Sequence, residues 1–550
     1  MKQWAARLRV KAPTGIALLL LITVVVANLI LPLLTLLAKS VEYQPFYQGF
    51  ADILSSNSTR TAVFNSCWVT LVAACFAVAV AFFYAYIVEI KLAKQYRRIF
   101  RFLAILPMLV PSITHGVVIV YLFGARGIFT RLFSLQLPIY GPLGIILGSF
   151  FYAFPAAFLI LSQAFAHLDG RYFETADVLG ASHSRRFLDI ILPIMKYALF
   201  SAFTVCFTMI FTDYGIPISV GGTFSILPVL FYKNVIGLLD FSRGAVYSTM
   251  LLLPAAVVYA VDILYFNRKQ VHSSQNPRPC PPGTFHLVQK VAFVFLTAVV
   301  IVPILIIAVV PFIEAWPYNL QVTFRHFQRI ISMGALGKLV QNSVLIAIAS
   351  GVGGSVLAFV AGYLYVRDKA GFQPLKKLAH GLYLTSLAIP GLALGLAYAL
   401  FFRRMPIYNT AWIIILCNIV HYFGSPYMMV ISHFKLLNPN LEAICQTLGG
   451  NWWNILVDVI LPNSKQMILD VFVYFFTNSM ITLSAVSILY TASTKTLAVQ
   501  LTAYSDQGTW ESAIAVSLVI LVINVAMKVL QLHRMEKQQC VLSAHPEKAM

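Results

Sequence analysis

Charged residues are scarce in this sequence, and acids are scarcer than bases. Only 11% of its 550 residues are charged, with 19 Asp and Glu against 39 Lys and Arg. Soluble domains carry about a quarter charged residues, and no stretch here is long and polar enough to form a separate soluble domain. The mean hydropathy of +0.82 and the recurring apolar runs of about 20 residues, enough to cross a bilayer, are typical of an integral membrane protein.

Motifs for catalysis or metal binding are also missing. The seven cysteines form no CxxC pair and the eleven histidines no HExxH motif, so the sequence indicates neither disulfides nor a metal site. It has no GxxxxGK[ST] phosphate loop, so it cannot hydrolyse ATP by that route. The sequence has no pair of catalytic residues that would favour a membrane-embedded enzyme. An ion-coupled secondary transporter would ordinarily have more acids and bases within its spans. We expect no cofactor and no metal.

The net charge of +20 follows membrane topology and does not indicate nucleic-acid binding. Basic residues gather in short loops between apolar runs, which is the positive-inside pattern. This pattern places five segments in the cytoplasm: 91–101, 168–192, 267–287, 367–378 and 434–463. Arg403 and Arg404 are exceptions, since they fall on the expected outer side. The basic start precedes an apolar run too long for a signal peptide, so we expect an uncleaved first span and a cytoplasmic N-terminus.

Twelve membrane spans are expected, with both termini in the cytoplasm. They cover about 16–38, 61–88, 102–124, 143–166, 193–212, 244–266, 288–312, 339–366, 380–402, 410–433, 464–488 and 512–532. The proline-rich stretch at 271–287 indicates a cytoplasmic linker. It divides the chain into a first repeat at 1–270, a second at 288–535 and a tail at 536–550.

The two halves repeat each other. Gly180 recurs as Gly449 at an offset of 269, and Pro193 recurs as Pro462 at the same offset. Further upstream, Asn65-Ser66 recurs as Asn342-Ser343 at an offset of 277, and Pro111 and Gly116 recur as Pro390 and Gly395 at 279. Offsets that hold within segments and drift between them indicate a duplicated unit with loop insertions. Six spans per half make the repeats parallel.

The most distinctive repeated segments are the loops 169–193 and 438–462. Each predicts a short helix, a left-handed glycine stop at Gly180 or Gly449, a second helix capped by Ser182 or Asn451, and a proline that leads into a span. An amphipathic helix held rigidly beneath the bilayer can be pushed by a cytoplasmic partner. Two such loops imply a partner with two matching sockets.

These loops resemble the EAA loop of permease subunits of binding-protein-dependent ABC importers. The matching positions are Glu174, Ala176, Gly180 and Pro193 in the first copy, and Gly449 and Pro462 in the second. In the second copy the glutamate, Glu442, stands one residue early, which implies two docking sites of unequal strength. The resemblance, which covers nearly the whole chain, is to the fused permeases for ferric iron or phosphonates.

The resemblance implies an all-α, MetI-like type I permease of about twelve membrane helices in two parallel six-helix repeats. It implies a bacterial inner-membrane location and two partners besides the lipid bilayer. One is a dimer of cytoplasmic ATPase subunits, which binds the ATP, and the other is an extracytoplasmic substrate-binding protein. The two loop helices would act as coupling helices, and nucleic acid has no role.

Polar residues within or beside the spans are candidates for the translocation path. In the first half they are Ser112, His115, Thr212, Asp213 and Tyr214, and in the second half Asn478 and Thr482. Asp213 can equally be a helix-capping group, and a lone histidine in a span is more often a packed, hydrogen-bonded residue. The segments Pro111–Gly116 and Ile389–Gly395 can break their helices and line a passage.

The substrate class is the least determined property. Arg126, Lys233 and Arg243 are expected near the outer mouth with few acids around them, which favours an anion by simple attraction. We therefore expect a phosphonate or phosphate ester, with ferric iron as the alternative. The same bases can instead contact the binding protein.

Overall fold

The computed structural model describes residues 18–42, 46–134, 136–261, 287–316, 318–332, 335–367 and 373–544. Within these ranges nine helices are long and apolar enough to cross a membrane, and two bent helix pairs pass the same test. They account for eleven of the twelve expected spans, and α24 (Leu461–Ile481) lies in the remaining one. The expected all-α membrane class is confirmed. The linker at 271–286 lies outside the described residues, and α15 begins at Leu287.

The chain forms two compact units, each described by itself. Unit 1 comprises residues 1–39, 337–497 and 522–550, and unit 2 comprises 40–336 and 498–521. The long helix α27 (Trp510–Ala544) contributes to both units and continues past residue 536, where the sequence predicts a tail.

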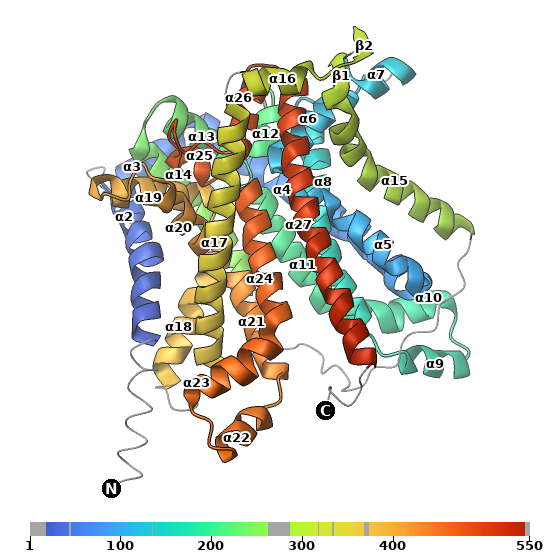
Figure 1. The fold of residues 1–550 in the computed structure, drawn as a ribbon. Helices are drawn as coiled ribbons and strands as arrows, with labels where there is room; N and C mark the ends of the chain where they lie inside the picture. The colour runs from blue at the N-terminus through green and yellow to red at the C-terminus, as the bar shows by residue number, and fades with distance from the viewer. Residues whose placement is uncertain are drawn as a thin grey trace. The chain divides into compact units, whose positions relative to one another are not determined.

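Unit 2 holds most of the first repeat (Figure 1). Its helices up to the first loop are α3 (Phe46–Ser55), α4 (Asn57–Tyr86), η2 (Ile87–Lys91), α5 (Lys94–Ile105), η3 (Leu106–Leu109), α6 (Ser112–Phe123), α7 (Ile128–Phe133), α8 (Pro142–Ala166) and α9 (Arg171–Val178). They are followed by α10 (His183–Arg185), η4 (Arg186–Ile191), α11 (Leu192–Thr212), α12 (Gly215–Val220), α13 (Leu227–Tyr232), η5 (Lys233–Gly237), α14 (Phe241–Val261), α15 (Leu287–Val309), η8 (Val310–Phe312) and α16 (Arg325–Ser332).

Unit 1 holds most of the second repeat. Its elements are η1 (Val26–Ile30), α2 (Leu31–Ser40), α17 (Ala335–Val366), α18 (Gln373–Thr385), η9 (Ser386–Ala388), α19 (Gly391–Phe401), η10 (Phe402–Arg404), α20 (Ala411–His421), α21 (Gly424–Leu436), α22 (Asn440–Thr447), α23 (Trp452–Asn454), η11 (Ile455–Ile460), α24 and α25 (Val486–Leu489). The next helix, α26 (Leu497–Asp506), starts at the boundary with unit 2.

Three of the expected spans are broken, two of them at the expected segments. Span 102–124 is interrupted at Pro111, and α6 starts at the next residue. Span 380–402 is interrupted at Pro390, where the two helices bend by 111°. Both prolines have extended backbone angles, since proline cannot donate the helical hydrogen bond. Their matched positions confirm the expected break. Span 410–433 bends by 53° between α20 and α21, without a proline at the break.

The core of unit 2 forms where α4 packs on α8. Ala73, Ala77 and Ala81 are fully buried at four-residue intervals along one face of α4. Small side chains at this spacing let two membrane helices approach closely. The ring of Tyr84 then meets Phe154 and Phe158 of α8 edge-on, each at 5.6 Å between ring centroids.

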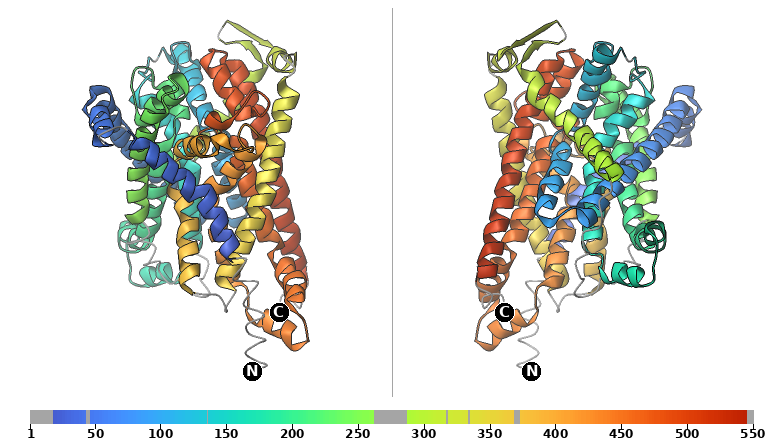
Figure 2. Two further views of the ribbon diagram at one scale, coloured as in Figure 1. Left: turned by 90° about the vertical axis from the view of Figure 1, so that its left-hand side faces the viewer. Right: turned by 90° about the vertical axis from the view of Figure 1, so that its right-hand side faces the viewer.

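The first helix of each repeat packs with the other repeat's helices. In unit 1, the Tyr398 hydroxyl of α19 donates to the Asn28 carbonyl of η1 at 2.7 Å, and Leu29 and Leu36 are buried. In unit 2, Phe293 of α15 lies 5.1 Å from the Tyr84 ring. Figure 2 shows the first helix, in dark blue, crossing its partners within unit 1.

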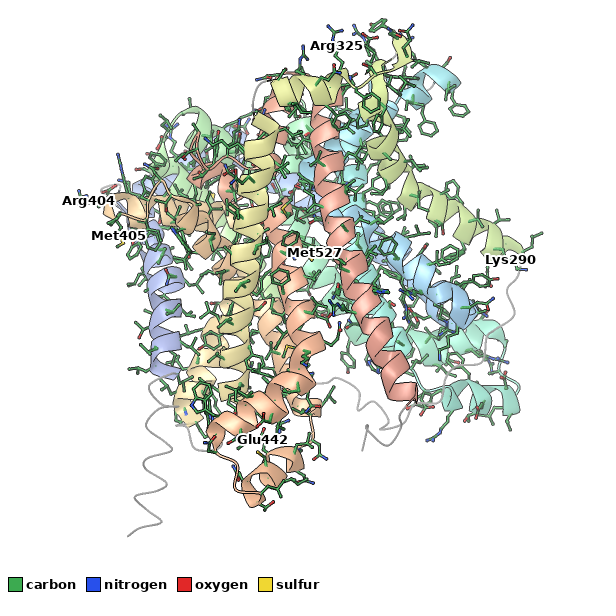
Figure 3. All side chains as sticks on the ribbon, viewed as in Figure 1. Lys290, Arg325, Arg404, Met405, Glu442 and Met527 are labelled. Atoms are coloured by element: carbon green, nitrogen blue, oxygen red, sulfur yellow. The ribbon has the colours of Figure 1, made fainter. Side chains whose placement is uncertain are left out.

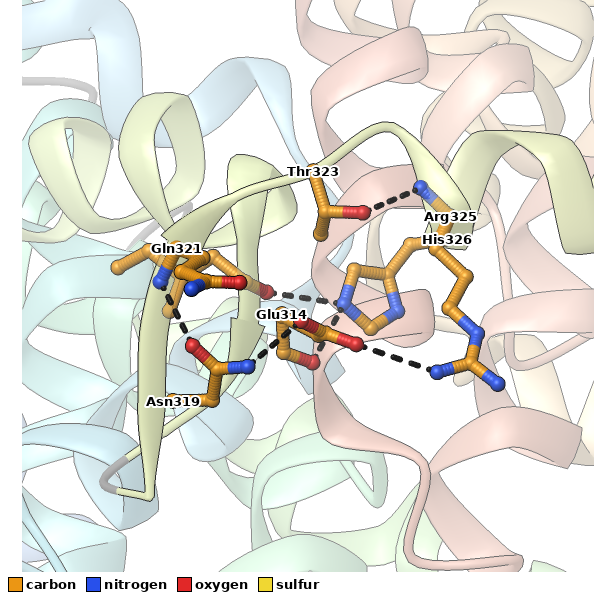
Figure 4. A network of polar contacts seen from close by, with 7 residues as sticks. Glu314, Asn319, Gln321, Thr323, Arg325 and His326 are labelled. Atoms are coloured by element: carbon orange, nitrogen blue, oxygen red, sulfur yellow. Dashed lines mark hydrogen bonds and ion pairs between the residues drawn. The ribbon is translucent and has the colours of Figure 1, made fainter.

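Unit 2 also has a two-stranded hairpin, which has no counterpart in the described part of the first repeat. Strand β1 (Ile313–Ala315) pairs antiparallel with β2 (Asn319–Val322), and α16 follows. Glu314 accepts from Asn319 at 2.7 Å and pairs with Arg325 at 3.2 Å, as Figure 4 shows. Trp316 donates to the Arg126 carbonyl at 2.9 Å. The hairpin is therefore fixed to the segment between α6 and α7, at the end of unit 2 opposite α9 (Figure 1).

Candidate coupling loops and transport path

The first repeated loop has the expected glycine stop. Helix α9 ends before Gly180, whose φ of +69° is left-handed. The Gly180 N–H donates to the Asp177 carbonyl at 3.1 Å, and the Ala181 N–H donates to the Ala176 carbonyl at 2.9 Å. This pair of bonds satisfies carbonyls that the helix end leaves free. Asp169 accepts from the Arg171 N–H at 3.1 Å at the other end of the helix. Pro193 stands in the first turn of α11.

The second loop repeats this construction around α22. Gly449 has a φ of +84°, and the Gly450 N–H donates to the Cys445 carbonyl at 2.9 Å. Asn451 and Asn454 then form a reciprocal capping box at the start of α23, which confirms the expected Asn451 cap. Pro462 stands in the first turn of α24. Both loops thus present a short helix whose orientation is fixed at its C-terminal end.

Large apolar side chains are exposed on both short helices. Leu179 and Leu448, which are equivalent positions of the two repeats, are 78% and 83% exposed. Val178 and Ile444 are also exposed, whereas Ala176 is buried. The apolar side chains of the first helix are therefore mostly not packed within the chain, apart from Ala176. Exposed apolar side chains grouped on a rigid element are typical of a protein interface.

The acidic residues of the two loops lie in different surroundings. Glu174 is on the exposed side of α9. Glu442 of α22 lies 3.5 Å from Arg367 at the end of α17, and both side chains are largely shielded; Figure 3 labels Glu442 in this loop. The first loop has an ion pair of another kind, between Asp177 and Arg186.

The path candidates of the first half gather where α11 ends. Asp213 accepts from the Ile216 N–H at 3.0 Å and from the Ser112 hydroxyl, so it caps α12 and holds the start of α6. Thr212 donates to the Thr208 carbonyl of its own helix. The buried Tyr214 ring stacks on Tyr232 at 4.8 Å. These contacts support the capping interpretation of Asp213.

His115 is buried in α6, where its Nε2 donates to the Pro107 carbonyl at 3.0 Å. Its Nδ1 has no hydrogen-bond partner among the described residues. His115 is therefore packed and hydrogen-bonded, and its role on the translocation path stays a prediction.

The candidates of the second half make local bonds as well. The Thr482 hydroxyl lies 2.8 Å from the Tyr422 hydroxyl and 2.6 Å from the Asn478 carbonyl. The Asn478 amide donates to the Tyr474 carbonyl at 2.8 Å. Each of these polar groups therefore has its hydrogen-bond partner within unit 1.

Sequence reasoning missed two polar positions in unit 1. His421, at the end of α20, is the repeat equivalent of Tyr152, whose ring neighbours His115 in unit 2. The repeat offset could have revealed it. Asp470 lies in the middle of α24 and accepts from Gln531 at 2.6 Å and from Gln466 at 2.8 Å. An acidic residue in the middle of a membrane span is costly, so Asp470 could have been selected from the sequence as a candidate functional residue.

The bases expected at the outer mouth are mostly engaged within the chain. Arg243 pairs with Asp240 at 3.5 Å, and Arg126 lies over the Tyr318 ring at 5.5 Å. With two of the three expected bases engaged, the argument for an anionic substrate weakens. Among the residues described, no group of three His, Cys, Asp or Glu side chains could hold a metal ion.

Comparison with known proteins agrees with this arrangement. The model of the family "Binding-protein-dependent transport system inner membrane component" matches residues 77–267 and 370–533. The ferric transport system permease protein FbpB of Actinobacillus pleuropneumoniae is 24% identical over 87% of this chain and 71% of its own. A candidate ferric permease, FbpB 1 of Haemophilus influenzae, is 24% identical over 79% of this chain and 70% of its own. A candidate sulfate permease, cysT of Prototheca wickerhamii, is 24% identical over 28% of this chain and 64% of its own.

Proposed function

On the premise that the chain belongs to the family of inner membrane components of binding-protein-dependent transport systems, we propose that it is the permease through which an ABC importer takes up ferric iron. The family match falls in both halves, so one chain supplies both permease repeats. The iron is cargo that the chain passes on. It is delivered by an extracytoplasmic binding protein and driven by a pair of ATPase subunits.

The two rigid loops support the coupling part of this proposal. Helices α9 and α22 have the same glycine stop, the same hydrogen bonds and exposed leucines at matched positions. Each would fit one ATPase subunit, and the proposal therefore has these loops and both termini in the cytoplasm, as the positive-inside pattern also predicts. The single observation that carries the coupling role is this duplicated, preorganised pair of apolar surfaces.

The relatives support the second of the two substrates that the sequence left open. Those that cover most of this chain are named for ferric transport, and they carry no mention of phosphonate. The preference for a phosphonate or phosphate ester is therefore not supported, and ferric iron replaces it. The pairing of Arg243 with Asp240 also reduces the positive charge on which the preference for an anion relied.

Reconstitution tests the cargo. Proteoliposomes would contain this chain, its ATPase subunit and its binding protein, and uptake of radioactive ferric iron would be compared with sulfate and an organophosphonate. We expect iron uptake that requires ATP and the binding protein. Uptake of either anion without iron would overturn the cargo, and iron uptake without the ATPase subunit would overturn the coupled mechanism.

The coupling surfaces are tested separately. Leu179→Asp and Leu448→Asp place a charge on the exposed apolar surface of each short helix. We expect each variant to lose the ATPase subunit during purification of the complex. Leu132→Asp is the matched control, because Leu132 is similarly exposed but lies on α7. Normal retention of the ATPase subunit by both loop variants would contradict the proposed docking.

A further inference from the structure

The second coupling loop is connected to a membrane helix through one charged side chain. Arg367 directly follows α17, and its Nη1 lies 3.5 Å from Oε1 of Glu442 in α22. Its Nη2 donates to the Leu437 carbonyl, three residues before α22 begins. The Arg367 side chain is 7% exposed and that of Glu442 is 22% exposed. Removing one partner from such a shielded pair leaves an uncompensated charge in a poorly solvated place.

The first half has apolar residues at the two equivalent positions. The repeat offsets of 277 and 269 place Ile90 and Phe173 at the positions of Arg367 and Glu442. Both are apolar; Ile90 belongs to the core of unit 2 and Phe173 packs against that core. The ion pair of the first loop joins Asp177 to Arg186, which also donates to the Ala181 carbonyl at 3.0 Å. Helix α9 is thus tied to the segment that leads into α11.

This difference accounts for the displaced glutamate of the second loop. Glu442 stands one residue before the position that Glu174 occupies in the first loop. One residue along an α-helix turns a side chain by about 100°. The displaced acid therefore reaches the end of α17, where Arg367 meets it. The displacement of Glu442 from the motif position therefore gives it Arg367 as its partner.

We propose that Arg367 and Glu442 are positioning residues that form a clamp between α22 and α17, so that the second ATPase contact moves α17. The proposal rests on the coupling role of α22 given above. It explains why the second loop keeps an acid even though its motif position is Ala443.

The contact between Arg367 and Glu442 can become shorter. Among the described residues, neither Arg367 Nε nor Glu442 Oε1 has a hydrogen-bond partner. Charge-assisted hydrogen bonds between nitrogen and oxygen are about 2.7–2.9 Å long, shorter than the 3.5 Å between Arg367 and Glu442. A small movement of α22 toward the end of α17 would complete such a bond. The clamp therefore favours the arrangement in which α22 is pushed toward α17.

The experiment uses the complete complex with its binding protein. Two quantities are measured: the ATPase activity without binding protein, and its stimulation by the iron-loaded binding protein. We expect Glu442→Gln and Arg367→Gln each to reduce the stimulation about tenfold, the size expected for coupled neighbours. The stimulation is expressed relative to the basal ATPase activity of the same assembled complex, so that a change in docking is not counted as a change in coupling. Asp240→Asn, which neutralises the acid of a more exposed ion pair, is the matched control and should leave the stimulation unchanged.

The exchanged pair, Arg367→Glu with Glu442→Arg, should recover most of the stimulation. Full stimulation in Glu442→Gln, or an assembled exchanged pair as impaired as the single variants, would overturn the clamp. If the exchanged pair does not assemble, the double variant with glutamine at both positions is measured. If this double variant assembles but is not stimulated, the clamp is supported. If it recovers both assembly and stimulation, the pair is purely structural and the clamp is overturned. A wild-type complex that iron-loaded binding protein fails to stimulate would instead count against the proposed cargo.

Discussion

The Ser66 hydroxyl of α4 accepts the backbone N–H of Leu227 at 2.8 Å. Leu227 is the first residue of α13, where a helix has an N–H without an intrahelical partner. The relationship recurs in the second half, where Ser343 accepts from Leu497 at 2.8 Å. The repeated Asn-Ser pair thus has a physical purpose, which is to fix a short helix to a long membrane helix.

Loss of either hydroxyl should destabilise the fold. Ser66→Ala and Ser343→Ala each remove a helix cap, which costs about 1 kcal/mol. We expect each variant to lower the melting temperature of the purified complex. Ser58→Ala, at an exposed position of the same helix α4, should leave it unchanged. A drop of equal size in the Ser58 variant would show that the cap contributes nothing specific.

The two glycine stops should tolerate no side chain that disfavours positive φ. Gly180→Pro or Gly449→Pro should abolish uptake while membrane insertion stays intact, because proline fixes φ near −65° and these glycines have +69° and +84°. Gly180→Ala should be milder, at about 1 kcal/mol of strain. Gly381→Ala, in α18 with open space around it and no positive φ, serves as control. Normal uptake by either proline variant would count against the coupling role.

Gly116 and Gly395 lie in the helices that follow the two proline breaks, and adding one methyl group at either position should destabilise the packing. A Cβ on Gly116 would lie 2.8 Å from Ser219 Cβ, and one on Gly395 would lie 2.8 Å from the Ala485 carbonyl oxygen. We expect Gly395→Ala to lower thermal stability more, by about 1–3 kcal/mol, because backbone yields less than a side chain.

A second-site change provides the control for that prediction. Adding Ser219→Gly to Gly116→Ala removes the closest contact and should restore part of the lost stability. An absence of rescue would mean that the approach of Ile216 O, at 3.1 Å, dominates and that the side-chain contact is unimportant.

Asp213 should behave as a capping group. Asn also caps helices well, so Asp213→Asn should retain most of the iron uptake, whereas Asp213→Leu leaves the Ile216 N–H and the Ser112 hydroxyl without their acceptor and should lose it. The measurement is the initial uptake rate in proteoliposomes. Loss of uptake in both variants alike would favour a role for the negative charge itself on the path.

Features set by local conformation were predictable from the sequence. Glycine and proline restrict the backbone conformation whatever surrounds them, as at Gly180, Gly449, Pro111 and Pro390. Because the chain is a repeat, each of these features occurs twice in the sequence. The bend between α20 and α21 was missed, although Gly424 and Pro426 stand in the first turn of α21.

Partners distant in the sequence were not predictable. Arg367 and Glu442 belong to different helical segments with two broken spans between them, and only the folded chain shows that the displaced acid has its own base. Likewise, no local pattern pairs Asn28 with Tyr398. The preference for an anionic substrate relied on counting bases near the expected mouth, and the sequence did not show that Asp240 pairs with Arg243.

The exchange of first helices has a consequence for biosynthesis. The helical segment that begins at Leu18 leaves the ribosome long before its packing partners in unit 1, the first of which starts at Gly337. All of the chain between Ser40 and Leu336, which belongs to unit 2, is made in the interval. At a synthesis rate of roughly 5–20 residues per second, the interval is about 15–60 s. During that time the nascent helix lacks its partners of unit 1, so that unit 1 cannot form until the second repeat has been made. Unit 2 also includes residues 498–521, so neither unit is complete before translation of the second repeat has nearly ended.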